Sequence, residues 1–132
     1  MAFLRRTLYL QALVWAVLGV ALAAFPKLLL VNLFDQLPLG DNAWVRIVGL
    51  QAFGLAMLMV LVAHRIDELW WWSWAFAIPT GLSAVTALLN AAFGLREGSS
   101  AVLWWLFGAV ALAFTVQLLY GLLRAGQERP IV

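Results

Sequence analysis

The stretch WVRIVGLQAFGLAMLMVLVA, residues 44–63, decides the fold class of this chain. Arg46 is its only charged residue and Gln51 its only amide. An α-helix rises about 1.5 Å per residue, so about 20 apolar residues cross the hydrocarbon core of a bilayer. The stretch is long enough to do so, and it predicts a transmembrane helix over residues 43–63.

Three further segments are apolar over a similar length: residues 7–25, 69–93 and 101–123. The first ends at Pro26, and the following residues 27–34 are apolar but too few to span a bilayer. We expect them to form a short helix in the membrane interface. The other connections are short, so consecutive helices should be antiparallel neighbours. The sequence predicts an all-α membrane protein, an antiparallel bundle of four transmembrane helices.

The composition indicates one membrane domain over residues 1–132. Hydrophobic residues make up 66% of the chain and charged residues 11%, whereas a soluble domain has about half apolar and about a quarter charged residues. The formal net charge of +2 comes from few, scattered side chains, which excludes the basic patch of a nucleic-acid-binding protein. The chain has no cysteine, so disulfides, thiol catalysis and thiolate metal sites are excluded.

The placement of arginine and lysine predicts the orientation in the membrane. Two arginines directly precede the first apolar segment, as in secretory signal peptides. Because mostly membrane segments follow, we interpret this segment as a first transmembrane helix. The positive-inside rule then predicts a bacterial inner-membrane protein with both termini cytoplasmic. The cytoplasmic side would hold Arg5, Arg6, Arg65, Arg124 and Arg129, and the other side Lys27, Arg46 and Arg96.

Tryptophans gather near the predicted ends of the spans. Residues 69–76, LWWWSWAF, contain four of the eight tryptophans in the chain. An indole ring has an apolar body and one polar N–H, so it is most favourable at a membrane–water interface. Successive helical positions rotate by about 100°, so the adjacent tryptophans cannot all line one pocket. The predicted interface anchors are Trp44, Trp70, Trp71, Trp72, Trp74, Trp104 and Trp105.

Small residues form a stripe on the first span and another on the fourth. Their spacing of three or four residues puts each stripe on one helix face, where small side chains let helix backbones approach closely in lipid. Packing within the bundle is the plainer interpretation, and an oligomer or partner surface is the alternative. The stripes comprise Ala12, Ala16, Gly19 and Ala23 on the first span and Gly108, Ala111 and Thr115 on the fourth.

Polar residues occur at two depths in the spans. Arg46 and Gln51 lie near the start of the second span, and Thr86 and Asn90 near the end of the third. These four should share an outer-leaflet layer, and they are the candidate ligand-binding residues. A guanidinium with five donors suits carbonyl, carboxylate or phosphate acceptors. We expect Arg46 to point into the bundle and hold an acceptor, with a snorkelling side chain as the alternative. A second, inner layer would contain Gln11, Gln117 and Tyr120.

No catalytic or metal-binding set is present in the sequence. His64 is the only histidine, and all carboxylates lie in predicted loops or in the tail. No phosphate-binding loop, zinc-protease or serine-hydrolase motif occurs. Proton pumps and ion-coupled transporters normally need an ionisable group inside the membrane. Arg46, near the start of the second span, is the nearest candidate for such a group. We therefore expect no enzymatic activity, no metal and no cofactor.

The order of these features resembles a known family. The helix that ends at Pro26 is followed by the amphipathic stretch KLLLVNLF, then by residues 44–63, a polar turn and two more spans. This order resembles the small four-helix bacterial membrane proteins of the DoxX-like kind, with Arg46 and Gly49 as the nearest thing to a motif. The resemblance covers most of the chain and implies links to quinone or redox systems. No redox cysteine can be carried over, because the chain has none.

Two functions are compatible with these features. The first is a structural or accessory membrane subunit that acts through helix packing, in a homo-oligomer or with other membrane subunits. Short loops and the missing catalytic set favour it. The alternative is a binding or transport module for an apolar ligand, a lipid or a quinone, whose headgroup would meet the outer-leaflet polar layer. In both cases membrane lipids are the surroundings, and no nucleic acid is expected as a partner.

Overall fold

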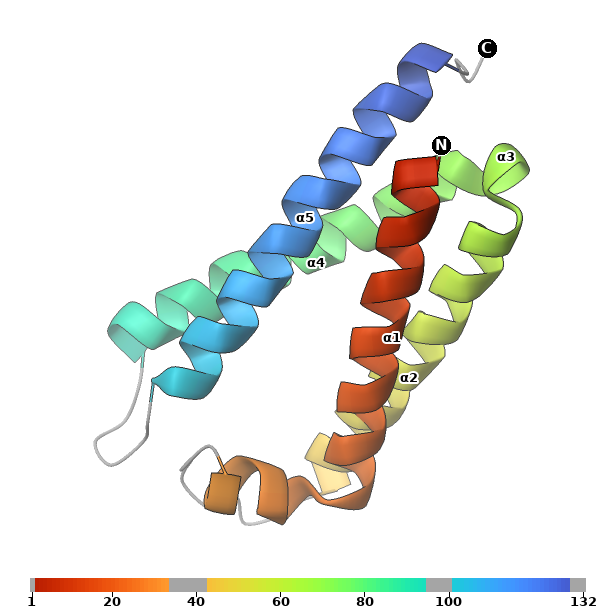
Figure 1. Cartoon of the computed structure of the whole chain (residues 1–132). Helices are drawn as coiled ribbons and strands as arrows, with labels where there is room; N and C mark the ends of the chain where they lie inside the picture. Colours follow the sequence, from red (N-terminus) through yellow and green to blue (C-terminus); the bar gives the residue numbers. More distant parts are fainter. Residues whose placement is uncertain (1, 34–42, 95–100, 129–132) are drawn as a thin grey trace.

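The computed structural model describes residues 2–33, 43–94 and 101–128, and in these residues it contains helices and no strand. Four helices are long and apolar enough to cross a membrane. They are α1 (Ala2–Ala24), α2 (Ala43–His64), the span Ile66–Gly94 and α5 (Val102–Glu128) (Figure 1). The predicted all-α, four-span architecture is confirmed, and the chain is a multi-pass membrane protein.

The third span is longer and less regular than the single helix predicted over residues 69–93. It consists of α3 (Ile66–Leu69), the 3₁₀ turn η2 (Trp70–Ser73), α4 (Trp74–Leu89) and the π-helical turn η3 (Asn90–Gly94). The helix is interrupted where four bulky or polar residues, WWWS, follow one another. A 3₁₀ turn winds more tightly than an α-helix. The tryptophan side chains therefore point in directions that differ from those expected for the predicted α-helix.

Two other predicted boundaries also differ from the structure. The helix α1 begins five residues earlier than expected, and α5 continues five residues further, to Glu128. Arginines lie in both extensions, where long side chains can reach water from the end of a span. The segment after Pro26 is a short helix as expected, and its residues Leu28–Leu33 (η1) have π-helical winding. Phe34, Arg96 and Arg129 lie outside the described residues.

The helices form two hairpins that diverge toward one end. α1 packs against α2, α4 packs against α5, and α1 also packs against α5. By contrast, α2 and α4 make almost no contact with each other within the described segments. α3 and η2 join them at the end where both chain termini lie, and from there the hairpins separate (Figure 1). One side of the bundle is therefore open.

Glycines set the distance between paired helices. A Cβ atom on Gly19 would lie 2.5 Å from the carbonyl oxygen of Gly49, and one on Gly49 would lie 2.5 Å from the oxygen of Gly19. α1 and α2 thus cross backbone to backbone. In the other hairpin, a Cβ on Gly108 would lie 2.6 Å from Leu88 Cδ2. Lipid supplies no hydrophobic drive for helix association, so this close packing is what holds each hairpin together.

The remaining residues of the predicted small stripes lie along the same contacts. Ala12 and Ala111 are buried, whereas Ala16, Ala23 and Thr115 are half-buried. Thr115 approaches α4, since its Cγ2 would be 3.3 Å from a Cβ on Gly81. These residues therefore serve contacts inside this chain in the structure.

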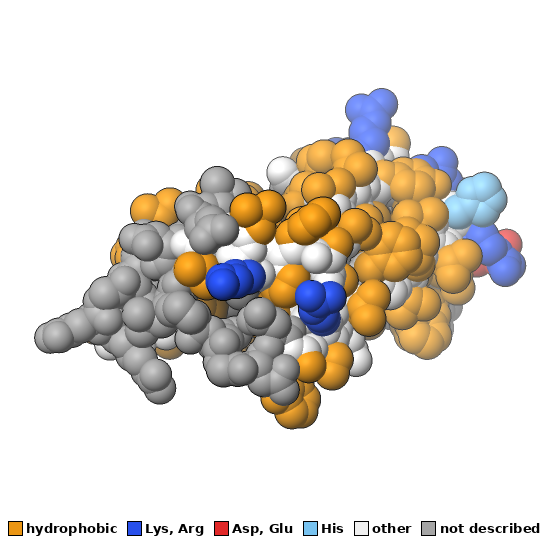
Figure 2. Space-filling view, turned by 90° about the horizontal axis from the view of Figure 1, so that it is seen from below, with side chains coloured by type: hydrophobic (Ala, Val, Ile, Leu, Met, Phe, Trp, Pro, Cys, Tyr) orange, Lys and Arg blue, Asp and Glu red, His pale blue; other side chains and the backbone are white. Residues whose placement is uncertain are grey.

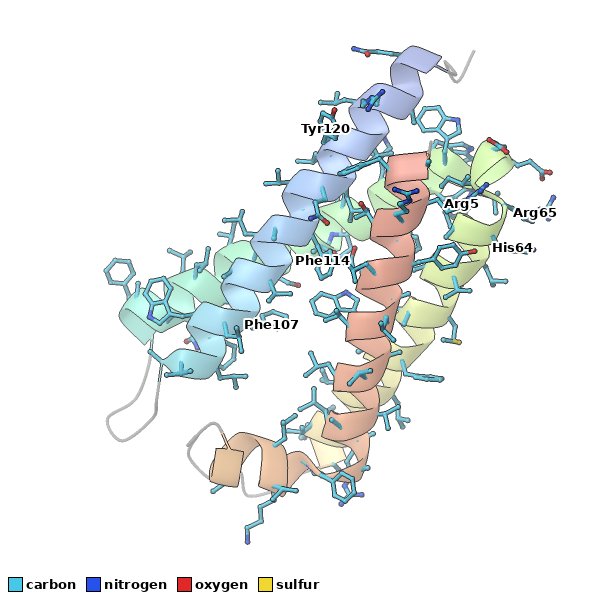
Figure 3. All side chains as sticks on the ribbon, in the orientation of Figure 1. Arg5, His64, Arg65, Phe107, Phe114 and Tyr120 are labelled. Atoms are coloured by element: carbon cyan, nitrogen blue, oxygen red, sulfur yellow. The ribbon has the colours of Figure 1, made fainter. Side chains whose placement is uncertain are left out.

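The best-packed part of the core lies at the end where the hairpins converge. The largest fully buried apolar side chains include Leu4, Leu8, Met59, Ile66 and Leu118. The Arg5 guanidinium reaches across to this end of α2 and donates a 3.1 Å hydrogen bond to the Ala63 carbonyl oxygen. Figure 3 shows Arg5 beside the end of α2 that carries His64 and Arg65. Among the described residues, the diverging end carries no comparable core, and a cavity forms there.

The predicted tryptophan anchors fall into two groups. Trp44, Trp71, Trp72, Trp74 and Trp105 are exposed, and Trp104 is half-buried. Trp70 differs, because it is buried in the core at the junction of the hairpins. On the face that Figure 2 shows, hydrophobic side chains predominate among the described residues, and charged groups occupy small separate patches. Such a surface is expected where lipid is the solvent.

Candidate ligand cavity

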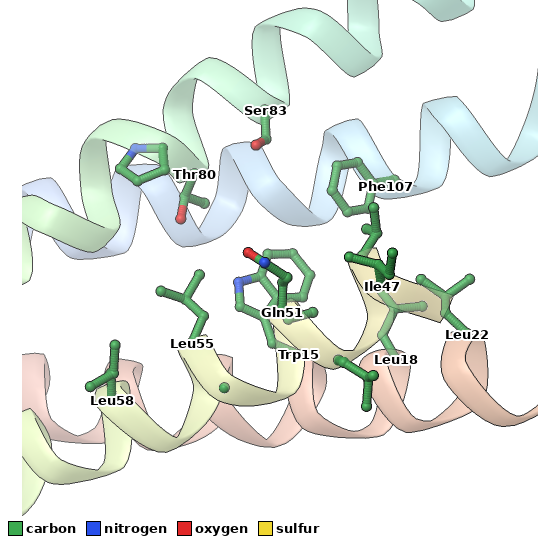
Figure 4. A pocket seen from close by; sticks show the side chains of 15 residues that line it. Trp15, Leu18, Leu22, Ile47, Gln51, Leu55, Leu58, Thr80, Ser83 and Phe107 are labelled. Atoms are coloured by element: carbon green, nitrogen blue, oxygen red, sulfur yellow. The ribbon is translucent and has the colours of Figure 1, made fainter. Parts of the chain in front are cut away.

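A cavity of about 830 Å³ lies between the diverging hairpins. All four spans contribute to its walls (Figure 4). α1 contributes Trp15, Leu18 and Leu22, α5 contributes Phe107, and α4 contributes Pro79, Thr80 and Ser83. α2 contributes the largest share of the lining: Ile47, Val48, Leu50, Gln51, Ala52, Gly54, Leu55 and Leu58. Because α2 and α4 hardly touch, the cavity is open between them.

Trp15 forms the aromatic wall of this cavity. Its ring stacks on Phe107, with centroids 5.7 Å apart and planes 21° apart, and meets Phe114 edge-on at 6.0 Å. Figure 3 shows Phe107 and Phe114 on the side of α5 that faces α1. Trp15 is the one tryptophan that was not predicted to be an interface anchor, and it lies deep in the span. Its position between hairpins gives it a packing role that interfacial tryptophans lack.

Two polar side chains in the cavity have no hydrogen-bond partner within the described residues: the Gln51 amide and the Ser83 hydroxyl. Figure 4 shows Gln51 projecting from α2 toward Thr80 and Ser83 on α4. Gln51 comes eight residues after Ala43, about 12 Å along the helix. Ser83 precedes the last residue of its span, Gly94, by eleven positions. Both groups therefore lie more than two helical turns inside their spans.

Thr80 is already engaged by the protein. Its hydroxyl donates to the Phe76 carbonyl oxygen at 2.6 Å and accepts from the Gln11 amide nitrogen at 3.0 Å. Gln11 itself is fully buried, and its Oε1 has no partner in the described part of the chain; the same holds for Ser73 Oγ. The Gln11–Thr80 bond connects α1 to α4 at the inner limit of the cavity.

Of the four predicted ligand-binding residues, the structure brings only Gln51 into the cavity. Arg46 is exposed on α2 and does not line it, so its side chain does not point into the bundle as expected. One position along an α-helix turns a side chain by about 100°, and it is Ile47 that faces the cavity. The exposed position matches the snorkelling alternative.

Thr86 and Asn90 also lie outside the cavity. Thr86 is exposed, and its hydroxyl donates to the Leu82 carbonyl oxygen at 2.8 Å, which satisfies it within its own helix. Asn90 begins the π-helical turn η3, and its side-chain oxygen points back toward Gly94. The predicted four-residue outer layer is therefore not assembled. Within the inner layer, Gln11 is buried, Gln117 is half-buried and Tyr120 is exposed against Phe3 and Arg124.

Sequence reasoning assigned neither Thr80 nor Ser83 to the candidate site. The face that packs inward on α4 comprises Phe76, Ala77, Thr80, Ala84 and Ala87. Its signal in the sequence is the run of small residues at steps of three and four, which is the pattern recognised on α1 and α5. That pattern identifies the packed face more directly than the polar residues do.

The cavity supplies hydrogen bonds and apolar surface but no charge. None of its lining residues is acidic, basic or histidine. No group of three or more potential metal ligands occurs among the described residues. The arrangement is suited to binding, and no acid or base among the described lining residues would activate the Ser83 or Thr80 hydroxyl.

In comparisons with known proteins, no family model, no curated protein and no solved structure matches this chain.

Proposed function

We propose that this chain binds an apolar or amphiphilic membrane ligand, a lipid or a quinone, in the cavity between its hairpins. The observation that supports this function is an open cavity of about 830 Å³ with apolar walls and two unpartnered polar groups, Gln51 and Ser83. Ligand sites in proteins commonly have volumes of about 300–1,000 Å³ and place a few polar groups in apolar walls. A cavity that opens between two spans admits a ligand from the bilayer itself.

The proposed setting is a bacterial inner membrane, with both termini in the cytoplasm. Arg5, Arg6, Arg65 and Arg124 lie near the end of the bundle that carries the termini, whereas Lys27 and Arg46 lie near the other. The positive-inside rule assigns the end richer in arginine to the cytoplasm. Under this orientation the cavity opens in the outer half of the membrane.

Gly54 allows a sharp test, because it lines the cavity and a Cβ built there meets nothing within 4 Å. The variant Gly54→Leu should fill the cavity without disturbing the backbone. The protein would be purified in a mild detergent, and bound lipids would be counted by native mass spectrometry. We expect wild type to retain a lipid or quinone that Gly54→Leu loses.

The control is Ala113→Leu, a similar enlargement at an exposed position on α5 outside the cavity. It should retain the ligand at the level of wild type. Equal retention by wild type and both variants would mean that the co-purified molecules are annular lipid, and it would exclude the cavity as their site.

A structural or accessory role in a homo-oligomer or a larger membrane complex stays a prediction. The same purification tests it, because partner subunits would co-purify in fixed ratio. Filling the cavity would leave such an assembly intact, so Gly54→Leu separates the two functions.

A further inference from the structure

We propose that the cavity selects an amphiphile with an uncharged, oxygen-bearing headgroup and rejects anionic phospholipids. This inference rests on the proposed function, since it specifies the chemical class of the ligand that the cavity would hold.

The cavity lining carries no charge that could pair with a charged headgroup. Its polar side chains, Gln51, Thr80 and Ser83, are neutral, Trp15 adds one indole N–H, and the other lining residues are apolar. The nearest cation along α2 is Arg46, whose exposed side chain lies outside the lining. A phosphate or ammonium group in this cavity would therefore lose its hydration without gaining an ion pair, which is strongly unfavourable inside a membrane.

The hydrogen-bonding groups match a carbonyl or a hydroxyl. Because the Thr80 hydroxyl already donates to Phe76 and accepts from Gln11, the available groups include the Gln51 amide and the Ser83 hydroxyl. The Gln51 amide nitrogen and the Ser83 hydroxyl can each donate to a carbonyl oxygen, and the Gln51 oxygen can accept from a hydroxyl. An ester, a ring carbonyl or an alcohol satisfies these groups without bringing charge.

The depth of these groups leads to the same class of ligand. Gln51 lies about 12 Å along α2 from Ala43, below the level at which phospholipid headgroups remain in water. A ligand whose headgroup reaches Gln51 must leave that water. The stacked rings of Trp15 and Phe107 then offer its tail or a flat ring an apolar surface.

The test compares two lipids with identical acyl chains, neutral dioleoylglycerol and anionic dioleoylphosphatidate. Each would be titrated onto delipidated full-length protein in a non-ionic detergent, and bound lipid would be measured by native mass spectrometry. We expect wild type to bind dioleoylglycerol at least about tenfold more tightly, since an unpaired charge in a span is disfavoured by more than that factor.

Gln51→Lys should reverse this preference, because it places a cation among the polar groups of the cavity. Gln117→Lys introduces the same cation on α5 outside the cavity, and it should keep the wild-type preference. Gln51→Leu is the variant to use if the lysine prevents folding, and it should weaken dioleoylglycerol binding several-fold without improving binding of phosphatidate.

Each outcome has a distinct meaning. Equal or tighter binding of phosphatidate to wild type, abolished by Gly54→Leu, would overturn the selection for neutral headgroups and leave the proposed function standing. Binding of neither lipid would overturn this inference, and binding that Gly54→Leu leaves unchanged would overturn the proposed function together with it.

Discussion

Gln11 on α1 donates a 3.0 Å hydrogen bond to the hydroxyl of Thr80 on α4, and both side chains are buried. The bond joins the two hairpins beside the cavity. It is also asymmetric, because Thr80 keeps a second bond to the Phe76 carbonyl oxygen, whereas Gln11 has no other partner for its amide among the described residues.

This asymmetry predicts unequal effects of removing either partner. Thr80→Val should destabilise the protein by about 1–3 kcal/mol, because it leaves the Gln11 amide buried without any hydrogen bond. Gln11→Met has a similar shape and removes the buried amide altogether, so it should cost less than about 1 kcal/mol. The free energy of unfolding would be measured by titration with a denaturing detergent. Equal losses in the two variants would show that the bond itself, and not desolvation of Gln11, determines the stability.

The crossing of Gly19 and Gly49 predicts a second pair of effects. Gly19→Ala should destabilise the α1–α2 hairpin by about 1–3 kcal/mol, because its Cβ would lie 2.5 Å from a backbone oxygen that cannot move aside easily. Gly54→Ala is the matched control on α2, where a Cβ meets nothing within 4 Å. It should be neutral or stabilising by up to about 1 kcal/mol, since alanine favours the helix. The same unfolding titration serves, and similar losses in both variants would contradict the close crossing.

The fold class could be predicted from the sequence because it depends only on the length of each apolar segment. The face of each helix that packs inward could not be predicted in the same way. In water, the buried face of a helix is apolar and the exposed face is polar, but in a membrane both faces are apolar. The second span illustrates this: Met59 is fully buried, whereas Leu58 and Leu61 are exposed.

The same physics explains the mixed outcome for the candidate site. Gln51 was recognised because an amide in a span is unusual. Thr86 was assigned to the site because it is polar, but a threonine can satisfy its hydroxyl on its own helix and face lipid. The divergence of the hairpins depends on contacts between spans that are far apart in the sequence. Composition alone does not reveal these contacts. Small residues were the more reliable guide, since Gly19 and Gly108 both lie at helix crossings.

The tryptophan cluster predicts different roles for adjacent residues. Trp70 is 6% exposed and Trp71 is 45% exposed. Trp70→Ala should therefore destabilise the protein by about 3–5 kcal/mol, the range for emptying a large aromatic site in a core. Trp71→Ala should have a much smaller effect, because Trp72 and Trp74 remain to anchor the same end. Detergent unfolding of the two variants provides the measurement, and a silent Trp70→Ala would argue against its packed position.

Topology can be tested cleanly, because the chain has no cysteine of its own. If both termini are cytoplasmic, a cysteine in place of Asp67 should be protected from an impermeant maleimide in intact cells. A cysteine in place of Ser99 should be labelled, once any outer membrane has been made permeable. Both variants should react after lysis, which controls for accessibility. The opposite labelling pattern would invert the proposed orientation.

The position of Arg46 predicts tolerance of a conservative change. Its side chain is exposed on α2, close to the end of the span, and it does not line the cavity between the hairpins. A long cationic side chain at such a position can extend to lipid headgroups and water, and lysine can do the same. Arg46→Lys should therefore match wild type in unfolding free energy and in co-purified lipid. Arg46→Leu should insert as well, because removing a charge from a span favours insertion. A loss of bound lipid in Arg46→Lys alone would show that the fork of the guanidinium holds an acceptor. In that case Arg46 would belong to the ligand site, and its exposed position in this structure would not be the position it takes when ligand is bound.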